Sequence, residues 1–286
     1  MIYTCYSDLS DCIRRNIWKI PADIGLIVGV PRSGMLAALM VAELMNRRCV
    51  DIDSFISGRT MQCGGRGIFI NGGKENKVLV IDDTVNSGNS MRKVRKKLAS
   101  MTQYDFVFAC VYAEGQKAKD MVDLWFEDVW RKGETKWFYE WNILHHYEGN
   151  TRYFMFDIDG LLCKEPPDER IPDAYRLYLP DAIPMVIPTT FIGALVTYRL
   201  EKYRDITERW LEKYGVTYGQ LFMYDAESYE IRNSAESPAC YKARLFKKAT
   251  WAILFLESSA GQAEQIHRMT GKPVFCYENG KMYGNG

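Results

Sequence analysis

The stretch Val78–Ser90, VLVIDDTVNSGNS, begins with four aliphatic residues, continues with two aspartates and ends in small polar residues. A short apolar run bounded by turn residues is typical of a strand buried on both faces. Asp82 and Asp83 follow this predicted strand, and Asn86–Ser90 opens a predicted helix. Because ligands of open α/β sheets bind beyond the carboxyl ends of the strands, we expect the two acids at a binding site.

The loop after the acids has the composition of a phosphate-binding site. Free backbone N–H groups at a helix start, with hydroxyl side chains beside them, bind a phosphate. Asp82 and Asp83 are unsuited to face that phosphate, and they suit vicinal hydroxyls or a bound magnesium ion. A ligand with a phosphate at one end and a diol in the middle is a ribose 5-phosphate. The loop consists of Asn86, Ser87, Gly88, Asn89 and Ser90.

Across all its positions, Val78–Ser90 resembles the phosphoribosyl-diphosphate (PRPP) motif of type I phosphoribosyltransferases. The stretch GVPRSGM, Gly29–Met35, resembles the pyrophosphate loop of the same family. The resemblance implies that PRPP is the substrate and that Arg32, Ser33 and Gly34 contact its diphosphate. The alternative for the acidic stretch is a capped helix after an acidic turn.

The resemblance also suggests roles for a basic segment and for Asn86. The glycine-rich, basic segment 57–77 contains Arg59 and Arg66 and matches the family's flexible catalytic loop in position. A solvated surface loop is the alternative for this segment. In purine phosphoribosyltransferases, a carboxylate at the position of Asn86 handles a proton on the base. An amide cannot exchange that proton, so a purine acceptor handled in that way is disfavoured.

An aromatic segment is expected to form the hood over the acceptor. It is KWFYEWNILHH, residues 136–146, and its rings at Trp137, Tyr139 and Trp141 can stack on a base or a sugar. A small hydrophobic core within the hood is the alternative role for these rings.

The stretch FMFDIDGLLC, residues 154–163, carries a second pair of carboxylates. Asp157 is expected at the tip of a strand, with Asp159 two residues later. At this spacing the first acid can attack phosphorus and the second can protonate the leaving oxygen. Both need a magnesium ion, because two acids would otherwise repel a phosphate dianion.

Further along the chain, other polar residues suit the same chemistry. Thr197 ends another predicted strand and suits a hydrogen bond to the transferring phosphoryl group. Lys242 can neutralise the aspartate and phosphate charges, with Lys247 and Lys248 as alternatives. Glu257 ends a third strand and can reach a magnesium ion.

The order of these residues resembles the haloacid-dehalogenase (HAD) phosphatases from residue 151 to the C-terminus. The resemblance implies Asp157, Asp159, Thr197 and Lys242 as catalytic residues, and Mg²⁺ held by Asp157, Asp159 and Glu257. The family usually has a second acid where this chain has Ser258, so a non-catalytic HAD domain is the alternative. The short segment between Cys163 and Pro188 predicts a capless domain with an open site.

The hydrophobic pattern alternates strands and helices and restarts near Gly149. We therefore predict an α/β chain of two domains, a phosphoribosyltransferase-like parallel sheet in residues 1–149 and a capless HAD-like Rossmannoid domain in 150–286. Strands are expected at 24–30, 50–56, 77–81, 105–113, 121–126, 152–156, 191–196 and 251–256. Helices are expected at 33–48, 90–101, 201–215 and 260–271.

Composition excludes several classes of function. The chain has 286 residues, 47% hydrophobic and 26% charged, and a net charge of +1, so it offers no basic field for nucleic acid. No apolar run is long enough to span a membrane, and the N-terminus lacks the apolar core of a signal peptide. The eight scattered cysteines favour a reducing cytoplasm, and three histidines disfavour a histidine metal centre.

Together, the two resemblances imply transfer of 5-phosphoribosyl followed by removal of its phosphate. The whole chain resembles the dual-domain ribofuranosyltransferases of bacterial surface-polysaccharide (O-antigen or capsule) assembly. This implies PRPP and a glycan acceptor, such as a lipid-linked intermediate, as partners; the oligomeric state stays open, a homodimer included. A nucleobase phosphoribosyltransferase fused to a nucleotidase, and a PRPP-sensing regulator, are the alternatives.

Overall fold

The computed structural model describes residues 2–59, 73–129, 137–146 and 148–284. Packing divides the chain into two compact units, Tyr6–Thr135 on one side and Met1–Cys5 with Lys136–Gly286 on the other. This division differs from the boundary predicted after residue 149, since the expected hood segment packs with the second unit. No helix among the described residues has the length and apolarity needed to cross a membrane.

The unit Tyr6–Thr135 contains a five-stranded, fully parallel sheet, in the order β3-β2-β4-β5-β6. The chain adds β3 on one side of β2 and the later strands on the other, so the order reverses between β2 and β4. Such a switch point opens a crevice at the carboxyl ends of the two strands. The strands are β2 (Ile24–Gly29), β3 (Arg48–Asp51), β4 (Lys74–Val85), β5 (Asp105–Ala113) and β6 (Leu124–Asp128).

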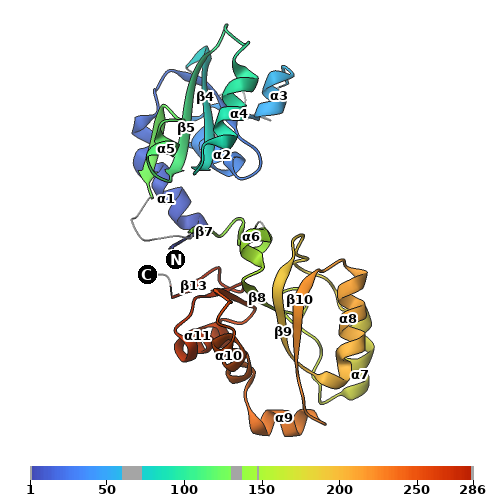
Figure 1. Ribbon diagram of the computed structural model, residues 1–286. Coiled ribbons are helices and arrows are strands. Elements are labelled where there is room, and N and C mark those ends of the chain that lie inside the picture. The colour runs from blue at the N-terminus through green and yellow to red at the C-terminus, as the bar shows by residue number, and fades with distance from the viewer. Residues whose placement is uncertain (1, 60–72, 130–136, 147, 285–286) are drawn as a thin grey trace. The chain divides into compact units, whose positions relative to one another are not determined.

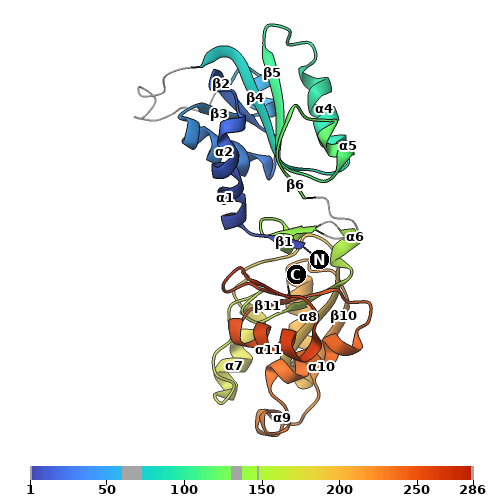
Figure 2. The ribbon, with the colours of Figure 1, turned by 90° about the vertical axis from the view of Figure 1, so that its left-hand side faces the viewer.

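Helices cover both faces of this sheet because its strands are apolar on both sides. Val78 and Val80 pack in one core with Met91 and Val94 of α4. The alternate residue Leu79 is also fully buried, on the face where α2 contacts β4. Figure 2 shows α1 and α2 on one side of the sheet and α4 and α5 on the other. The helices are α1 (Tyr6–Asn16), α2 (Gly34–Met45), α3 (Ile52–Ile56), α4 (Asn89–Leu98) and α5 (Gln116–Lys119), with a 3-10 turn η1 (Ile17–Lys19).

Two predicted strands of this unit were wrong at their carboxyl ends by several residues. The strand expected at 50–56 stops at Asp51, whose carboxylate accepts the N–H groups of Asp53 and Ser54 at 3.0 Å each. This cap starts α3 and so converts the second half of the expected strand into a helix. Conversely, β4 continues past the expected end at residue 81 to Val85, because β5 pairs with it along that length.

The second unit contains a six-stranded sheet in the order β10-β9-β8-β11-β12-β13, parallel except for β13. Here the order reverses between β8 and β11, which places a second crevice at their carboxyl ends. The strands are β8 (Phe154–Asp157), β9 (Ile192–Leu200), β10 (Tyr218–Tyr224), β11 (Leu254–Glu257), β12 (Val274–Cys276) and β13 (Met282–Tyr283).

Alternate residues of these strands face two hydrophobic cores. Phe156 packs with Trp210 of α8, and Met155 packs with Phe246 of α10. Figure 1 shows α8 on one side of the sheet and α10 and α11 on the other. The helices are α6 (Glu148–Thr151), α7 (Pro172–Tyr178), α8 (Arg204–Lys213), α9 (Tyr229–Ala235), α10 (Pro238–Lys248) and α11 (Ala260–Thr270), with 3-10 turns η3 (Ile143–His145), η4 (Leu179–Asp181) and η5 (Glu201–Tyr203).

The N-terminal residues belong to the second unit through a small sheet. Strand β1 (Ile2–Thr4) pairs in parallel with β7 (Trp137–Tyr139). Phe138 is fully buried in the core of the second unit, and Tyr139 is 6% exposed and stacks on Trp141 at 4.9 Å. Phe138 of the aromatic segment therefore belongs to the core of the second unit, and the stacking role of Trp137, Tyr139 and Trp141 toward an acceptor stays a prediction.

Candidate functional sites

The first crevice lies where β2 and β4 end. The loop after β2 carries Ser33, whose hydroxyl donates a hydrogen bond of 2.9 Å to Oδ1 of Asp83 on β4. Gly34 lies so close to β4 that an added Cβ would come within 2.6 Å of Asp82 Oδ1. Arg32 is exposed at the same loop, next to a cis Pro31–Arg32 peptide bond. The structure thus brings together the two sequence segments that resemble the PRPP site.

The acid pair of this crevice is shielded from water. Asp82 is 7% exposed and Asp83 is 4% exposed. Asp82 Oδ1 accepts the backbone N–H of Asp83 at 3.0 Å. Burial, followed by the charge of Asp83, raises the pKa of Asp82 well above its usual value. Such a pair suits a ligand that donates hydroxyl protons or brings a cation.

The predicted phosphate loop joins β4 to α4. Gly88 has the left-handed φ of 73°, and an added Cβ would lie 2.3 Å from the Met121 side chain. The loop therefore needs glycine at this position both for its backbone conformation and for its close approach. The side chains of the loop are exposed around the first turn of α4 at Asn86, Ser87, Asn89 and Ser90.

Beside this loop lies an open cavity of about 590 Å³. Asn86 and Ser87 form part of its wall, and the segment after β5, together with Asp128 of β6, forms the rest. An ion pair of 2.5 Å joins Lys119 to Asp128 at its edge. Of the two arginines of the expected catalytic loop, Arg59 is exposed just after α3, and Arg66 lies outside the described residues.

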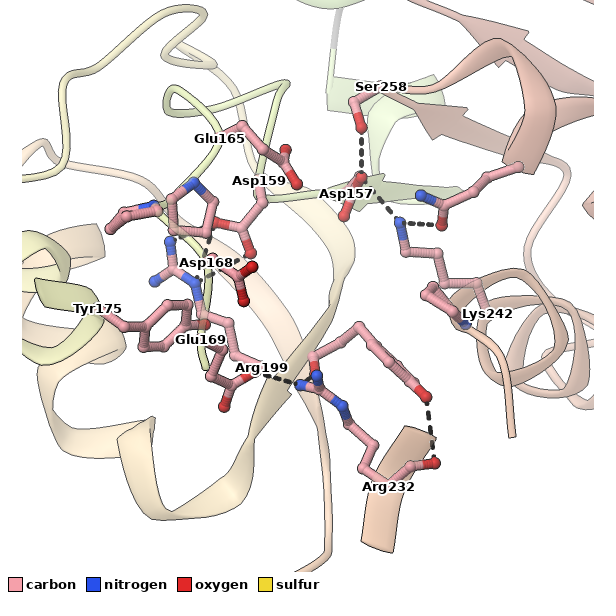
Figure 3. A pocket seen from close by; sticks show the side chains of 15 residues that line it. Asp157, Asp159, Glu165, Asp168, Glu169, Tyr175, Arg199, Arg232, Lys242 and Ser258 are labelled. Carbon is pink, nitrogen blue, oxygen red and sulfur yellow. Dashed lines mark hydrogen bonds and ion pairs between the residues drawn. The ribbon is translucent and has the colours of Figure 1, made fainter. Parts of the chain in front are cut away.

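The second crevice holds a buried cluster of two carboxylates and one lysine, of which Figure 3 draws Asp157 and Lys242. Lys242 Nζ, from α10, lies 2.8 Å from Asp157 Oδ2 and 2.8 Å from Glu257 Oε2. Asp157 ends β8 and Glu257 ends β11, so the switch point places them side by side. Burial alone would lower the pKa of Lys242, but the two carboxylates raise it above its usual value. Lys242 therefore stays protonated, whereas burial, followed by the charge of Glu257, raises the pKa of Asp157 well above its usual value.

Asp159 is held by residues of β9. Arg199 binds both of its carboxylate oxygens, with Nη2 at 2.6 Å from Oδ1 and Nε at 3.0 Å from Oδ2. The hydroxyl of Thr197 donates to Oδ2 at 3.0 Å. Arg199 is 1% exposed, and its pKa is raised because Asp159 outweighs the lowering effect of burial. Thr197 thus hydrogen-bonds the second aspartate, in addition to any role toward a phosphoryl group.

The predicted magnesium ligands differ in their availability. Among the described residues, no group of three His, Cys, Asp or Glu side chains is placed to hold a metal ion. The carboxylate of Asp159 is taken up by Arg199 and Thr197. Asp157 and Glu257 are hard oxygen donors, and Mg²⁺ is commonly held by one or two carboxylates together with water and substrate phosphate. These two residues match the ion in chemistry, but Lys242 and Ser258 already bind their oxygens, so Mg²⁺ would have to displace some of these contacts. The side chain of Asp159 is held at both oxygens by Arg199.

A cavity of about 250 Å³ extends from this cluster. One wall comes from the short segment between Cys163 and Pro188, from which a capless, open site was predicted. Asp157, Asp159, Lys242 and Ser258 lie at one part of the cavity (Figure 3). The remaining lining residues are Glu165, Pro166, Pro167, Asp168, Glu169, Tyr175, Tyr198, Arg199, Arg232, Pro238 and Gln262.

Sequence reasoning missed five charged residues of this cavity, which are Glu165, Asp168, Glu169, Arg199 and Arg232. Arg199 could have been found, because it is two residues after Thr197 on a strand and so points to the same face. Glu169 and Arg232 carried no such signal. They are far apart in the sequence, and only the fold brings them to a distance of 2.9 Å.

Each unit is thus an α/β sheet with a polar, partly buried site at its switch point. No protein-family profile matches the chain, and no curated protein matches it. Part of the chain is similar to the xanthine-guanine-hypoxanthine phosphoribosyltransferase of Helicobacter pylori, with 17% identity over 50% of this chain and 93% of that chain, at a TM-score of 0.35. An orotate phosphoribosyltransferase from Aeropyrum pernix shows 21% identity over 42% of this chain and 67% of that chain, at 0.31.

A third likeness covers most of the chain. It is to a chain of a Pnkp1/Rnl/Hen1 complex, with 15% identity over 92% of this chain and 99% of that chain, at a TM-score of 0.35. At these scores and identities the likenesses do not carry an activity to this chain. Its function is inferred below from its own residues.

Proposed function

We propose that the unit Tyr6–Thr135 binds PRPP and transfers its 5-phosphoribosyl group to an acceptor. The observation that carries this proposal is the 2.9 Å hydrogen bond from Ser33 to Asp83, which joins the two PRPP-like segments at one switch point. The Asn86–Ser90 loop would hold the 5-phosphate, and the backbone around Arg32 would hold the diphosphate. Asp82 and Asp83 would accept hydrogen bonds from the ribose hydroxyls.

We further propose that the second unit is a phosphatase that removes the 5-phosphate from the transferred group. Asp157 would attack phosphorus, and Lys242 would keep the attacking carboxylate oriented and partly neutralised. Asp159, fixed by Arg199 and Thr197, would face the leaving oxygen. Mg²⁺ held by Asp157 and Glu257 would reduce the repulsion between the carboxylates and a phosphate dianion.

The two steps together would transfer unphosphorylated ribose. We propose a glycan hydroxyl as the acceptor, in the assembly of a bacterial surface polysaccharide. Asn86 in the phosphate loop supports a hydroxyl acceptor over a purine, because an amide cannot exchange a proton with the base. The near-neutral net charge of +1 argues against a regulator that binds nucleic acid.

Diphosphate release from PRPP tests this proposal. The full chain with PRPP and magnesium should release diphosphate when supplied with lipid-linked glycan acceptors, and free nucleobases should not stimulate that release. Stimulation of this release by nucleobases alone would show that the acceptor is a base and not a glycan. Binding of PRPP without diphosphate release under any acceptor would identify a sensor and remove the transferase assignment.

A further inference from the structure

Arg232 and Glu169 form a buried ion pair in the wall of the phosphatase cavity (Figure 3). Arg232 Nη1 lies 2.9 Å from Glu169 Oε2, and the side chains are 8% and 12% exposed. The same nitrogen donates to the backbone oxygen of Tyr198 at 2.6 Å, and the guanidinium lies 4.1 Å from the centre of the Tyr198 ring. Because Tyr198 directly follows Thr197, the pair is fixed against the strand that holds Asp159.

Glu169 carries an acceptor that the described part of the chain leaves unsatisfied. Its Oε2 is paired with Arg232, whereas its Oε1 is buried and has no hydrogen-bond partner among the described residues. A buried acceptor without a donor costs free energy, so such atoms mark places where a ligand or water completes the structure. Since Glu169 lines the cavity, a hydroxyl group of a molecule bound there could supply the missing donor.

The charges of this wall disfavour a second anionic group on the substrate. Glu165, Asp168 and Glu169 all line the cavity, and Arg232 is already paired with Glu169. Arg170, the cation that pairs with Asp168, has a side chain that is 72% exposed to solvent. A further phosphate or carboxylate would therefore meet more carboxylates than free cations, whereas neutral hydroxyl groups find acceptors.

The size of the cavity also favours a small ligand. Its volume of about 250 Å³ lies below the range of roughly 300–1,000 Å³ that is common for drug-sized ligands. A single phosphorylated sugar suits this space better than a long polyanion.

We propose that the Glu169–Arg232 pair binds hydroxyl groups of the sugar that carries the scissile phosphate, so that the site selects polyol phosphates of the ribose 5-phosphate type. Glu169 Oε1 accepts the hydroxyl proton, and Arg232 fixes the carboxylate in the orientation that allows this. The inference rests on the phosphatase activity proposed above and adds its specificity-determining residues.

A ratio of specificity constants tests the inference. The full-length wild type and Glu169→Gln are assayed with ribose 5-phosphate and with p-nitrophenyl phosphate, which has no sugar hydroxyl. Glu169→Gln replaces a charged acceptor by a neutral amide, so the ratio of kcat/KM for ribose 5-phosphate over p-nitrophenyl phosphate should fall about ten- to hundredfold, mainly through KM. Glu264→Gln, from an exposed pair with Arg268, is the matched control and should leave the ratio unchanged.

The outcomes separate this inference from the proposed function. An unchanged ratio in Glu169→Gln, or an equal loss on both substrates, overturns the hydroxyl-binding role while leaving a phosphatase in place. Arg232→Lys keeps the charge but loses the planar contacts to Tyr198, and it should lower the same ratio if Glu169→Gln fails to fold. A wild type that hydrolyses neither substrate overturns the phosphatase assignment itself and this inference with it.

Discussion

Arg199 binds both carboxylate oxygens of Asp159 from the adjacent strand, at 2.6 Å and 3.0 Å, with its own side chain 1% exposed. The guanidinium of Arg199 is buried, and it donates a further hydrogen bond of 3.2 Å to the hydroxyl of Thr207. Asp159 is therefore oriented by the protein before any substrate arrives. In the proposed reaction this fixes the second aspartate at a constant place relative to Asp157.

Replacement of Arg199 by lysine should separate charge from geometry. The substitution Arg199→Lys keeps the positive charge, but a single ammonium group cannot span both oxygens of Asp159. We expect phosphatase kcat to fall at least about tenfold and the melting temperature to fall, because Asp159 loses one of its charge-assisted hydrogen bonds. Arg268→Lys, in an exposed pair with Glu264, should change neither quantity. Wild-type kcat in Arg199→Lys would show that the bidentate contact is not needed.

The acid pair of the first site should be needed for transfer and not for the fold. The double substitution Asp82→Asn with Asp83→Asn keeps the shape of both side chains but removes their negative charges. We expect diphosphate release from PRPP to be lost and hydrolysis of p-nitrophenyl phosphate to remain. Asp53→Asn, from an exposed pair with Lys97, is the control and should retain both activities. Full diphosphate release from the double variant would remove this site assignment.

The buried Asp82 should make the stability of the first unit depend on pH. Its pKa in the folded chain is raised above the ordinary value of 3.8, so folding favours its protonated form. The corresponding stability is present below pH 3.8 and is lost as pH rises toward the folded pKa, by about 1.4 kcal/mol for each unit of the shift.

The single variant Asp82→Asn tests this dependence. Asparagine resembles the protonated acid, so its melting temperature should exceed that of the wild type, and by more at pH 7.5 than at pH 4. Thermal unfolding followed by circular dichroism at both pH values measures the difference. An equal difference at the two pH values would show that Asp82 does not titrate as its burial requires.

Chelation should show whether the two proposed reactions depend on a divalent metal ion. In the second site, a phosphate dianion would approach the carboxylates of Asp157 and Glu257, which share one lysine, Lys242, so a further cation would reduce the repulsion. We expect EDTA to stop both diphosphate release and phosphatase activity, and excess magnesium to restore them. Turnover that persists in chelator would contradict the proposed use of Mg²⁺ in whichever reaction continues.

The sequence predicted the parts that depend on local patterns. The apolar run before Asp82 and the run before Asp157 gave the central strand of each sheet, and the alternation with helices gave the α/β class. Local patterns could not predict β1, because a three-residue strand is stable only when β7 pairs with it from far along the chain. The same pairing groups Trp137–Tyr139 with the second unit, whereas the predicted boundary after residue 149 assigns this segment to the first domain.

The same limit applies to the sites. Asp157 and Lys242 could be predicted as partners because a known motif order connects them. The Glu169–Arg232 pair could not, since the loop after β8 and the short helix α9 meet only through the folded sheet. Asp51 shows the opposite case, in which a local side-chain cap overrode an apolar pattern that favoured a strand.

The order of the two proposed steps can be tested with one substitution. The Asn86–Ser90 loop would recognise the 5-phosphate of PRPP, so this phosphate must remain until the ribosyl bond forms, and the phosphatase must act second. Asp157→Asn keeps the shape of the second site but replaces its nucleophile by an amide, which cannot form an aspartyl-phosphate. Loss of a covalent nucleophile typically costs several orders of magnitude in rate.

With PRPP, magnesium and the acceptor, Asp157→Asn should therefore accumulate a phosphoribosylated acceptor, heavier than the wild-type product by one phosphate group in mass spectrometry. Added Asp82→Asn, Asp83→Asn double variant lacks the transfer step but keeps the phosphatase, so it should convert this intermediate to the riboside. A phosphate-free riboside from Asp157→Asn alone would show that the second unit is not the phosphatase of this reaction. Ser258, which donates to Asp157 Oδ2 at 2.9 Å where the resembled family usually has an acid, would then be the first residue to test.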